Sequence, residues 1–532
     1  MAQPNSAPVS MLSPFKQRIF LAIWIAQMVS NIGTWMQSTA AAWMMTGLDP
    51  SPVMVALVQT ASNLPVFFLG FSAGAVADIF DRRKLLIFTQ LWMLISAGAL
   101  AFLTFTGATT PLLLLLLTFS LGIGSALMMP GFQAIFPDLV SRSEIPSAVT
   151  LNSVSYNIAR FIGPALGGIV VALAGPGPAF LLNAVSFIGV IAVLVPWKPK
   201  QRPVSHTAER LGSAIRAGVR YTRYSTELKA VLLHTGVFII FGSAIWALIP
   251  LVARFELGTG ADGYGILIAA AGAGSLIGAA VISRIRSRFS TNLMIMIAEL
   301  VFAVASIVLG FASSLPIAII AMLASGISWL TLVSNFNTMV QTVVPSWVQA
   351  RALGMYWMIF IGGNAIASYF WGVVADHAGV PATLMIVGIG LIVSVPVMWR
   401  IPVKDGVGLN MSPALCWKGT HVTPEQGHEA GPVFVTRNYR VDQLREREFL
   451  DAMREVERLC LRDGATDWRL IRDVDDPPRF VEVFIVDSWA EHLRQHERIT
   501  VADLGIEEKV RIFRVADTLS SVRHFVSAYQ NK

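Results

Sequence analysis

Apolar stretches long enough to cross a membrane dominate this chain. A helix needs about 20 mostly apolar residues to span the hydrocarbon core of a bilayer. Twelve such stretches can be placed, over residues 19–45, 53–77, 85–106, 111–134, 148–174, 179–196, 230–253, 263–283, 291–312, 316–343, 352–375 and 381–399. A polar segment, 197–229, separates six stretches from six. The sequence therefore predicts an all-α membrane protein with two six-helix bundles, at residues 19–196 and 230–402.

Charged residues gather at the C-terminal end of the chain. Residues 1–402 carry 21 Lys+Arg and 11 Asp+Glu, whereas residues 433–532 carry 17 and 19. Soluble domains usually contain about 25% charged residues. The first 400 residues are therefore predicted to lie in lipid and the last 100 in water, with a Gly- and Pro-containing linker at 403–432 between them.

The loops between the apolar stretches carry an uneven charge. If residues 1–18 lie inside the cell, the inner loops hold almost all the Lys and Arg, and the outer loops hold Arg254 beside acidic residues. Basic loops stay in the cytoplasm, so we expect a multi-pass protein of a bacterial inner membrane with both termini cytoplasmic. The net charge of +7 follows from this distribution, and no nucleic-acid partner is expected.

The loop after the second stretch reads GAVADIFDRRK, from Gly74 to Lys84. An aspartate at a helix end can accept charge-assisted hydrogen bonds from nearby arginines. The loop resembles the signature loop of the major facilitator superfamily, although Asp81 replaces its usual glycine. The resemblance implies a conformational latch between the two halves; its residues would be Gly74, Asp78, Arg82, Arg83 and, from the second half, Arg351. The alternative is a basic loop that only sets topology.

The fifth stretch contains RFIGPALGG, from Arg160 to Gly168. A proline inside a span breaks the backbone hydrogen-bond ladder, which neighbouring helices must then satisfy. The segment resembles the antiporter motif of exporters in the same superfamily, carried here by Gly163, Pro164, Gly167 and Gly168. The resemblance implies a bend that favours export, and the alternative is an ordinary kinked helix.

Polar and aromatic residues inside the spans predict a solute cavity. Arg160 lies near mid-bilayer, where a cation is costly unless it faces a cavity or a partner. The candidate cavity residues are Asn31, Thr34, Trp35, Ser38, Asn152, Tyr156, Arg160, Asn335 and Asn364. They would suit a medium-sized, partly apolar solute, and the cation would suit an anionic one. Hydrogen bonding between helices is the alternative for about half of them.

Glu299 is the one clear carboxylate inside a predicted span. A buried carboxyl group can bind and release a proton near neutral pH, so Glu299 is the candidate for proton coupling. Related drug/proton antiporters often carry their acid in helix 1 or 4, where this chain has none. No P-loop motif for direct use of ATP occurs, and no cofactor or metal is expected.

The last 100 residues are predicted to form a ferredoxin-like α+β domain, at residues 433–532. The expected order is strand 433–441, helix 446–462, strands 468–474 and 479–486, helix 488–500 and strand 508–516. The segment resembles the antibiotic-biosynthesis-monooxygenase-like dimeric α+β barrels, which implies a homodimer through this domain. Its candidate polar set is Asn438, Trp489, His492 and His496.

The combined pattern resembles the enterobactin-exporter-like, or transmembrane secretion effector, branch of the superfamily. The resemblance implies a secondary transporter, a proton-coupled exporter of a siderophore-, drug- or metabolite-like solute that works by alternating access. Its partners would be the small-molecule solute, protons and membrane lipid. Two alternatives stay open: a lipid or lysolipid flippase, and a transporter fused to a small monooxygenase-like enzyme.

Overall fold

The computed structural model describes residues 10–79, 81–197, 211–285, 288–403, 410–412, 414, 430–513 and 522–527. The chain forms two compact units. The span unit comprises residues 1–206, 234–336 and 356–402, and the tail unit comprises residues 207–233, 337–355 and 403–532.

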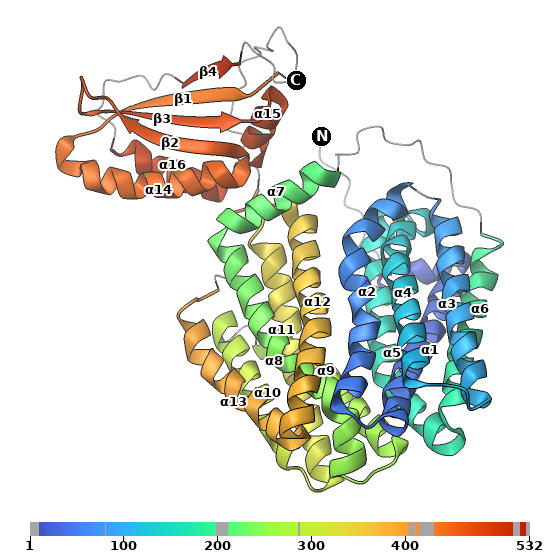
Figure 1. Cartoon of the computed structure of the whole chain (residues 1–532). Helices are drawn as coiled ribbons and strands as arrows, with labels where there is room; N and C mark the ends of the chain where they lie inside the picture. Colours follow the sequence, from blue (N-terminus) through green and yellow to red (C-terminus); the bar gives the residue numbers. More distant parts are fainter. Residues whose placement is uncertain are drawn as a thin grey trace. The chain divides into compact units, whose positions relative to one another are not determined.

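Long helices make up the span unit (Figure 1). In the first half they are α1 (Arg18–Leu48), α2 (Pro52–Ile79), α3 (Arg82–Phe105), α4 (Pro111–Leu139), α5 (Ile145–Ala174) and α6 (Pro176–Leu194). In the second half they are α8 (Thr226–Leu251), α9 (Ala261–Ile285), α10 (Thr291–Phe311), α11 (Leu315–Thr342), α12 (Ser346–Ala378) and α13 (Val380–Trp399). Twelve helices in the described ranges are long and apolar enough to cross a membrane. The predicted number of spans is confirmed.

Local sequence explains where these helices begin and end. Proline stands at or near the start of several spans, including Pro111 and Pro176, because the first turn needs no backbone N–H from it. The Thr110 side chain accepts a hydrogen bond from Leu113 N and caps α4. Gly175 has φ +80° between α5 and α6, a conformation that glycine adopts without steric cost.

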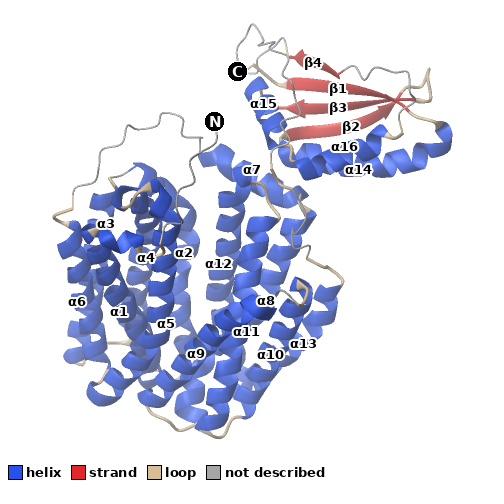
Figure 2. Cartoon of the chain, turned by 180° about the vertical axis from the view of Figure 1, so that it is seen from behind, coloured by secondary structure: helices blue, strands red, loops and turns tan. Residues whose placement is uncertain are grey.

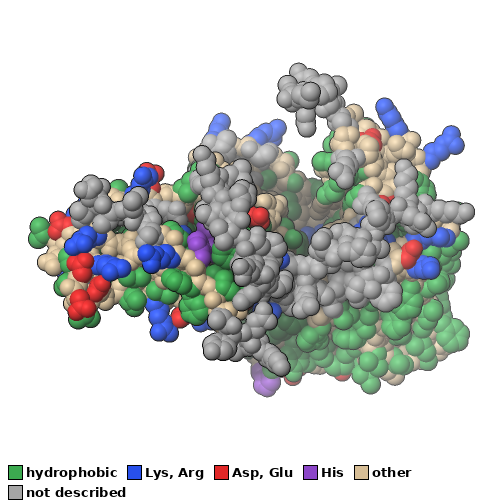
Figure 3. Space-filling model, turned by 90° about the horizontal axis from the view of Figure 1, so that it is seen from above, with side chains coloured by type: hydrophobic (Ala, Val, Ile, Leu, Met, Phe, Trp, Pro, Cys, Tyr) green, Lys and Arg blue, Asp and Glu red, His purple; other side chains and the backbone are tan. Residues whose placement is uncertain are grey.

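Consecutive spans run in opposite directions, so the helix ends fall into two sets. The basic end of the span unit carries Arg18, Arg82, Arg83, Lys84 and Arg400, and the opposite, acidic end carries Asp49, Glu256, Asp262 and Asp376. Figure 3 looks onto the basic end and shows Lys and Arg side chains around it. The described helices therefore keep the charge asymmetry that the loops predict.

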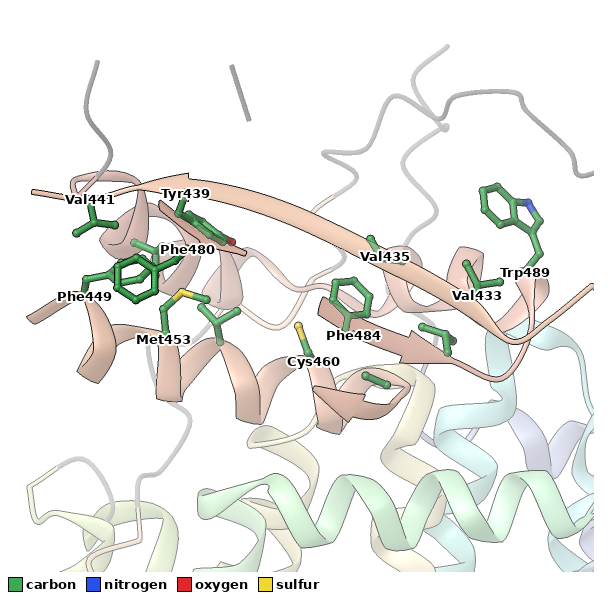
Figure 4. Packing of buried hydrophobic residues seen from close by; sticks show 14 residues of the cluster. Val433, Val435, Tyr439, Val441, Phe449, Met453, Cys460, Phe480, Phe484 and Trp489 are labelled. Carbon is green, nitrogen blue, oxygen red and sulfur yellow. The ribbon is translucent and has the colours of Figure 1, made fainter. Parts of the chain in front are cut away.

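The tail unit contains a four-stranded antiparallel sheet with the strand order β2-β3-β1-β4. Its elements are β1 (Val433–Arg440), α14 (Glu446–Asp463), β2 (Ala465–Arg472), β3 (Arg479–Val486), α15 (Trp489–Arg498), α16 (Val501–Arg511) and β4 (Val522–Val526). Helices α14 and α16 cover one face of the sheet (Figures 1 and 2). Val435, Phe449, Met453, Phe480 and Phe484 pack between α14 and that face (Figure 4).

One prediction about local structure is wrong. Residues 508–516 were expected to form the last strand, but helix α16 covers residues 501–511, and the last strand is β4. Thr500 and Asp503 form a capping box that starts α16. The polar segment 197–229, which separates the two halves, includes helix α7 (Leu211–Tyr224). The ferredoxin-like identity of the C-terminal domain stays a prediction.

Candidate functional site

Arg160 lies between two tryptophans that come from different halves of the span unit. Its guanidinium carbon is 5.8 Å from the ring centroid of Trp35 on α1 and 5.7 Å from that of Trp246 on α8. The described residues offer it no carboxylate within ion-pair distance. A cation in a span is stabilised by aromatic faces, but its hydrogen-bonding groups still need an acceptor.

Further hydrogen-bond donors surround Arg160. The Tyr156 side chain is 46% exposed, and its ring centroid is 6.1 Å from that of Trp35. The indole nitrogen of Trp246 is buried and has no hydrogen-bond partner among the described residues. A guanidinium, a phenol and an indole N–H together favour a ligand that is rich in acceptor oxygens. The sequence analysis had not singled out Trp246, whose only signal is an indole within an otherwise mostly aliphatic stretch of its span.

The second half of the span unit presents an aromatic cluster behind Trp246. The ring of Trp246 lies 5.2 Å from that of Trp329, and Trp329 lies 5.6 Å from Phe360. Phe238 and Phe302 also pack against Trp329, at 5.4 Å and 6.2 Å. Edge-to-face and tilted ring pairs of this kind are favourable. The site therefore has donors from both halves, and a cluster of buried aromatic rings packs against its second-half tryptophan.

The polar stripe of α1 splits between two environments. Thr34 and Ser38 do not accompany Trp35 but line a small pocket inside the first half, together with Gln37, Ser62, Thr118, Ser125 and Asn183. Asn183 on α6 donates to Gln37 Oε1, and Ser38 donates to the Thr34 carbonyl at 3.0 Å. Asn31 accepts from Gln27 on the same helix at 3.1 Å. Most of this stripe stabilises the first bundle internally.

The predicted asparagines have different surroundings. Asn364 on α12 is buried and accepts hydrogen bonds from Gln59 and Asn63 on α2, at 3.4 and 3.1 Å. It therefore joins the two halves. Asn335 is fully buried and donates to the Thr331 carbonyl on its own helix at 2.8 Å. Asn152 is half-buried on α5.

Glu299 is enclosed within the second half. Its side chain on α10 is 2% exposed, and the described residues give it no hydrogen bond or ion pair. Burying an unpaired carboxylate is costly, so such a group is held more readily in its protonated form. This placement is compatible with a proton-carrying role, which stays a prediction.

The glycine–proline motif of α5 forms a seam between three helices. A Cβ atom on Gly163 would lie 2.5 Å from the Trp35 Cβ of α1. A Cβ on Gly168 would lie 2.7 Å from both the Ala261 carbonyl oxygen and the Gly265 Cα of α9. Gly167 faces Met36 on α1, and Pro164 lies inside α5. The small side chains thus bring α5 into backbone contact with the second half.

Other contacts between the halves lie toward the same acidic end. Arg254 donates to Thr46 Oγ1 at 3.0 Å, and Trp43 stacks on Tyr264 with centroids 6.1 Å apart. Thr60 on α2 donates to the Ala365 carbonyl on α12 at 2.8 Å. Together with the α5–α9 seam, these contacts hold the two halves together at the acidic end.

The two predicted latch arginines of the first half, Arg82 and Arg83, lie at its basic end. Arg82 pairs with Asp138 at the end of α4, at 3.5 Å. Arg83 donates to the Leu194 carbonyl at 3.0 Å and also to the Val195 carbonyl, at the end of α6. Gly74 and Asp78 lie in α2, and the contacts of Gly74 and of the Asp78 side chain lie outside what the structure describes. Arg351 belongs to the tail unit, where it packs against Gly218. The latch between halves stays a prediction.

The C-terminal domain gathers three of its four candidate polar residues. Trp489, His492 and His496 lie together on α15 with His524 of β4, and the two Nε2 atoms of His492 and His496 are 3.3 Å apart. Burial, together with His524 and Arg437, lowers the pKa of His492 to about 4. Burial, together with His492 and Arg437, lowers the pKa of His496 to about 3.

The fourth residue, Asn438 on β1, has a different partner. It accepts a hydrogen bond from Arg479 at 3.1 Å. Within the described residues, no group of three or more His, Cys, Asp or Glu side chains is arranged to hold a metal ion. At neutral pH the imidazoles of His492 and His496 are therefore uncharged. A monooxygenase-like role for this domain stays a prediction.

A bundle of twelve spans with a mixed polar and aromatic centre defines a membrane transporter. The family described as "Transmembrane secretion effector" matches residues 9–532, which include the C-terminal domain. The chain belongs to this family and is a transporter of the major facilitator superfamily rather than an enzyme.

Three relatives of this chain are named as transporters, efflux pumps or exporters. The chain is 23% identical over 362 residues to the staphyloferrin A transporter of Staphylococcus aureus, covering 68% of this chain and 90% of the relative. It is 23% identical to the multidrug efflux pump Tap of Mycolicibacterium fortuitum, covering 70% and 92%. It is also 23% identical to the enterobactin exporter of Salmonella typhi, covering 70% and 90%.

Solved structures share the fold. A bacterial homologue of the human lysosomal transporter Spinster, inward-facing and unoccupied, aligns with a TM-score of 0.60 at 14% identity. The alignment covers 75% of this chain and 99% of that chain. At this identity the likeness concerns the fold alone, and it supports the arrangement of the twelve spans.

Proposed function

We propose that this protein exports a medium-sized solute that carries carboxylates or other anionic oxygens on a partly apolar, ring-containing body. The observation that carries the proposal is Arg160, placed between Trp35 and Trp246 without a carboxylate partner among the described residues. An unpaired cation in a span is costly. A solute anion would supply the missing charge at each transport cycle.

The chemistry of the site suits such a solute. A guanidinium presents a planar fork of N–H groups that can bind a carboxylate through two hydrogen bonds. The N–H of Trp246 and the hydroxyl of Tyr156 would add donors beside it. The rings of Trp35 and Trp246, which flank the guanidinium, would contact the apolar part of the solute, and the buried cluster around Trp329 would hold Trp246 in place.

The names of the relatives agree with this chemistry. Two of them are named for siderophores and one for multidrug efflux. Siderophore- or drug-like molecules also suit the donors and rings of the site. We therefore propose this solute class for the chain and leave the individual molecule open.

The charges at the two ends of the span unit support an orientation in the membrane. We assign the basic end, both termini and the C-terminal domain to the cytoplasm, because basic segments stay inside, and we assign the protein to a bacterial inner membrane. Contacts such as Arg254–Thr46 would then close the outer side. Export would proceed by rocking of the two halves. The motif from Gly163 to Gly168 would form the outer seam. The inner latch would consist of Gly74, Asp78, Arg82, Arg83 and Arg351.

We propose that protons drive the cycle through Glu299, whose enclosed carboxyl group has no described ion-pair partner. Glu299→Gln would keep the shape and remove the titrating group. In inverted vesicles we expect this variant to lose transport driven by a proton gradient while it still exchanges solute down a solute gradient. Gradient-driven transport at the wild-type level would contradict the assignment.

The test of the function itself compares the intracellular and secreted small molecules of a deletion strain with those of its parent. We expect a carboxylate-bearing metabolite to accumulate in the cells, and inverted vesicles containing the protein should take it up. If only labelled lysolipid changes leaflets, the flippase alternative gains support and our proposal fails. A homodimer through the C-terminal domain is a separate prediction, which mass photometry in detergent can check.

A further inference from the structure

Within the tail unit, helix α7 is joined to α15 of the C-terminal domain by an ion pair. Arg220 on α7 donates to Glu491 Oε1 at 3.0 Å. The same oxygen accepts from Arg498 at 2.6 Å, so two arginines share one carboxylate. Burial alone would raise the pKa of Glu491, but the hydrogen bonds and charges of Arg498 and Arg220 lower it below its ordinary value. The carboxylate stays ionised and holds both cations.

Aromatic residues extend this contact to the start of α12. The Arg498 guanidinium lies 4.6 Å from the ring centroid of Trp347, the second residue of α12. The Trp347 ring meets Tyr221 of α7 edge-on, with centroids 5.6 Å apart. Arg462 of α14 lies 5.3 Å from the Tyr221 ring. The C-terminal domain therefore contacts two segments that are more than 120 residues apart in the sequence.

The buried charges in this contact region are paired with opposite charges. Arg462 pairs with Asp463 at 2.7 Å and with Asp503 at 2.8 Å. The side chains of Asp463 and Arg498 are only 1% and 6% exposed. Exposed ion pairs contribute little, but breaking a buried pair leaves an uncompensated charge and is strongly destabilising. Such a network fixes one geometry rather than a loose association.

Both contacted segments lead directly into spans. Helix α7 ends at Tyr224 and α8 begins at Thr226, while Trp347 lies in the first turn of α12 itself. We propose that the C-terminal domain is a brace that holds the basic ends of α8 and α12 at a fixed separation, so that these spans move together when the halves rock. The brace rests on the proposed rocking transport cycle, and its site is the cluster Arg220, Tyr221, Trp347, Glu491 and Arg498.

The variant that tests the brace is Arg220→Gln, because it removes the α7 side of the contact and leaves the Glu491–Arg498 pair within the C-terminal domain. Arg494→Gln is the matched control. Arg494 also pairs with Glu491, at 3.3 Å, but it is half-exposed and belongs to α15 itself. Arg220→Lys, which keeps the positive charge, should restore part of the wild-type behaviour.

Two measurements on the full-length protein in lipid nanodiscs decide the outcome. Hydrogen exchange of α7 should rise by about tenfold in Arg220→Gln and stay near wild type in Arg494→Gln, while β1 and β3 stay protected in both. Spin labels at Lys229 on α8 and Ala350 on α12, both exposed, report the separation of these two spans at the basic end. Their distance distribution should broaden in Arg220→Gln and narrow again in Arg220→Lys.

Unchanged exchange of α7 in Arg220→Gln would overturn the ion pair as the attachment point. Increased exchange with an unchanged distance distribution would overturn the brace, because the domain would then be attached without restraining the spans. Neither measurement needs a solute. A protein that moves no carboxylate-bearing solute would thus overturn the proposed function while these results still judge the brace.

Discussion

Arg160 in the span unit and Arg498 in the tail unit both lie against tryptophan rings, yet only one of them has an anion. Arg498 lies over Trp347 and shares Glu491 with Arg220. Arg160 lies between Trp35 and Trp246, and no described carboxylate is within ion-pair distance. The aromatic surroundings are alike, so the anion is the informative difference.

This difference separates a structural arginine from a candidate binding arginine. A buried charge that is paired within the protein stabilises one conformation. A cation that keeps its hydrogen-bonding capacity free is compatible with a ligand that arrives and leaves. The two arginines should therefore respond oppositely when each is replaced, and the following predictions test that contrast.

The largest effect is expected for Arg160→Ala. Loss of charge-assisted hydrogen bonds to a solute anion should weaken binding by about 1.5–3 kcal/mol, which is about 10- to 150-fold. The thermal unfolding midpoint should not fall, because no internal ion pair is lost. Solute uptake by inverted vesicles and thermal unfolding in detergent measure the two properties. Wild-type uptake, or a folding defect that accounts for the loss, would contradict a binding role.

Arg498→Gln should show the reverse pattern. It removes the buried donor that Glu491 and the Asp463 carbonyl share, and Glu491 keeps only Arg220 and Arg494. The free energy of unfolding of the C-terminal domain should therefore fall by about 1–3 kcal/mol. Denaturant-dependent hydrogen exchange of β1 and β3 in the full chain measures this loss. Arg454→Gln is the control, because its pair with Asp451 is exposed and should contribute little. Equal stability of the two variants would remove the contrast with Arg160.

A smaller effect is expected at the seam that brings the two halves around Arg160. Gly168→Ala places a Cβ 2.7 Å from α9 backbone atoms, so α5 and α9 must separate at the acidic end. We expect a several-fold lower rate of solute uptake. Gly98→Ala on α3 is the matched control, because its Cβ would have no atom within 4 Å. Similar rates in both variants would show that the seam tolerates separation.

A further contrast concerns the pH response of the tail unit. The folded-state pKa values of His492 and His496, about 4 and about 3, lie below the ordinary value near 6.5. Between these limits the unfolded chain binds more protons, so the free energy of unfolding should fall as the pH drops from about 6.5 toward 4. Hydrogen exchange of β1 at several pH values, corrected for intrinsic exchange, would show it. His492→Gln with His496→Gln should flatten the dependence.

Sequence reasoning found the elements whose signal is local. The apolar periods gave all twelve spans, and β1, α14, β2, β3 and α15 were anticipated within a few residues. Helix α7 was missed because a short amphipathic basic segment resembles a loop between spans. Residues 508–511 of the expected last strand belong to helix α16 instead, since the capping pair Thr500–Asp503 outweighs the β-branched residues that follow.

Site residues that depend on tertiary contacts could not be found in this way. Trp246 is a candidate site residue only because α8 places it against Arg160. Asp138 forms an ion pair only because α4 ends beside Arg82. Thr34 and Trp35 are neighbours in sequence, but helix geometry turns them toward different surroundings. A stripe of polar residues shows that a helix face is buried, and the neighbouring helices decide what that face contacts.

The position of Arg160 between two indoles has a spectroscopic consequence. Indole emission responds to a nearby positive charge, so an anion that neutralises the guanidinium should change the fluorescence of Trp35 and Trp246. The chain has 14 tryptophans, and the difference between the wild type and Trp246→Phe would isolate this signal. Titration of intrinsic tryptophan fluorescence can therefore screen unlabelled compounds for binding at Arg160 before any transport assay exists.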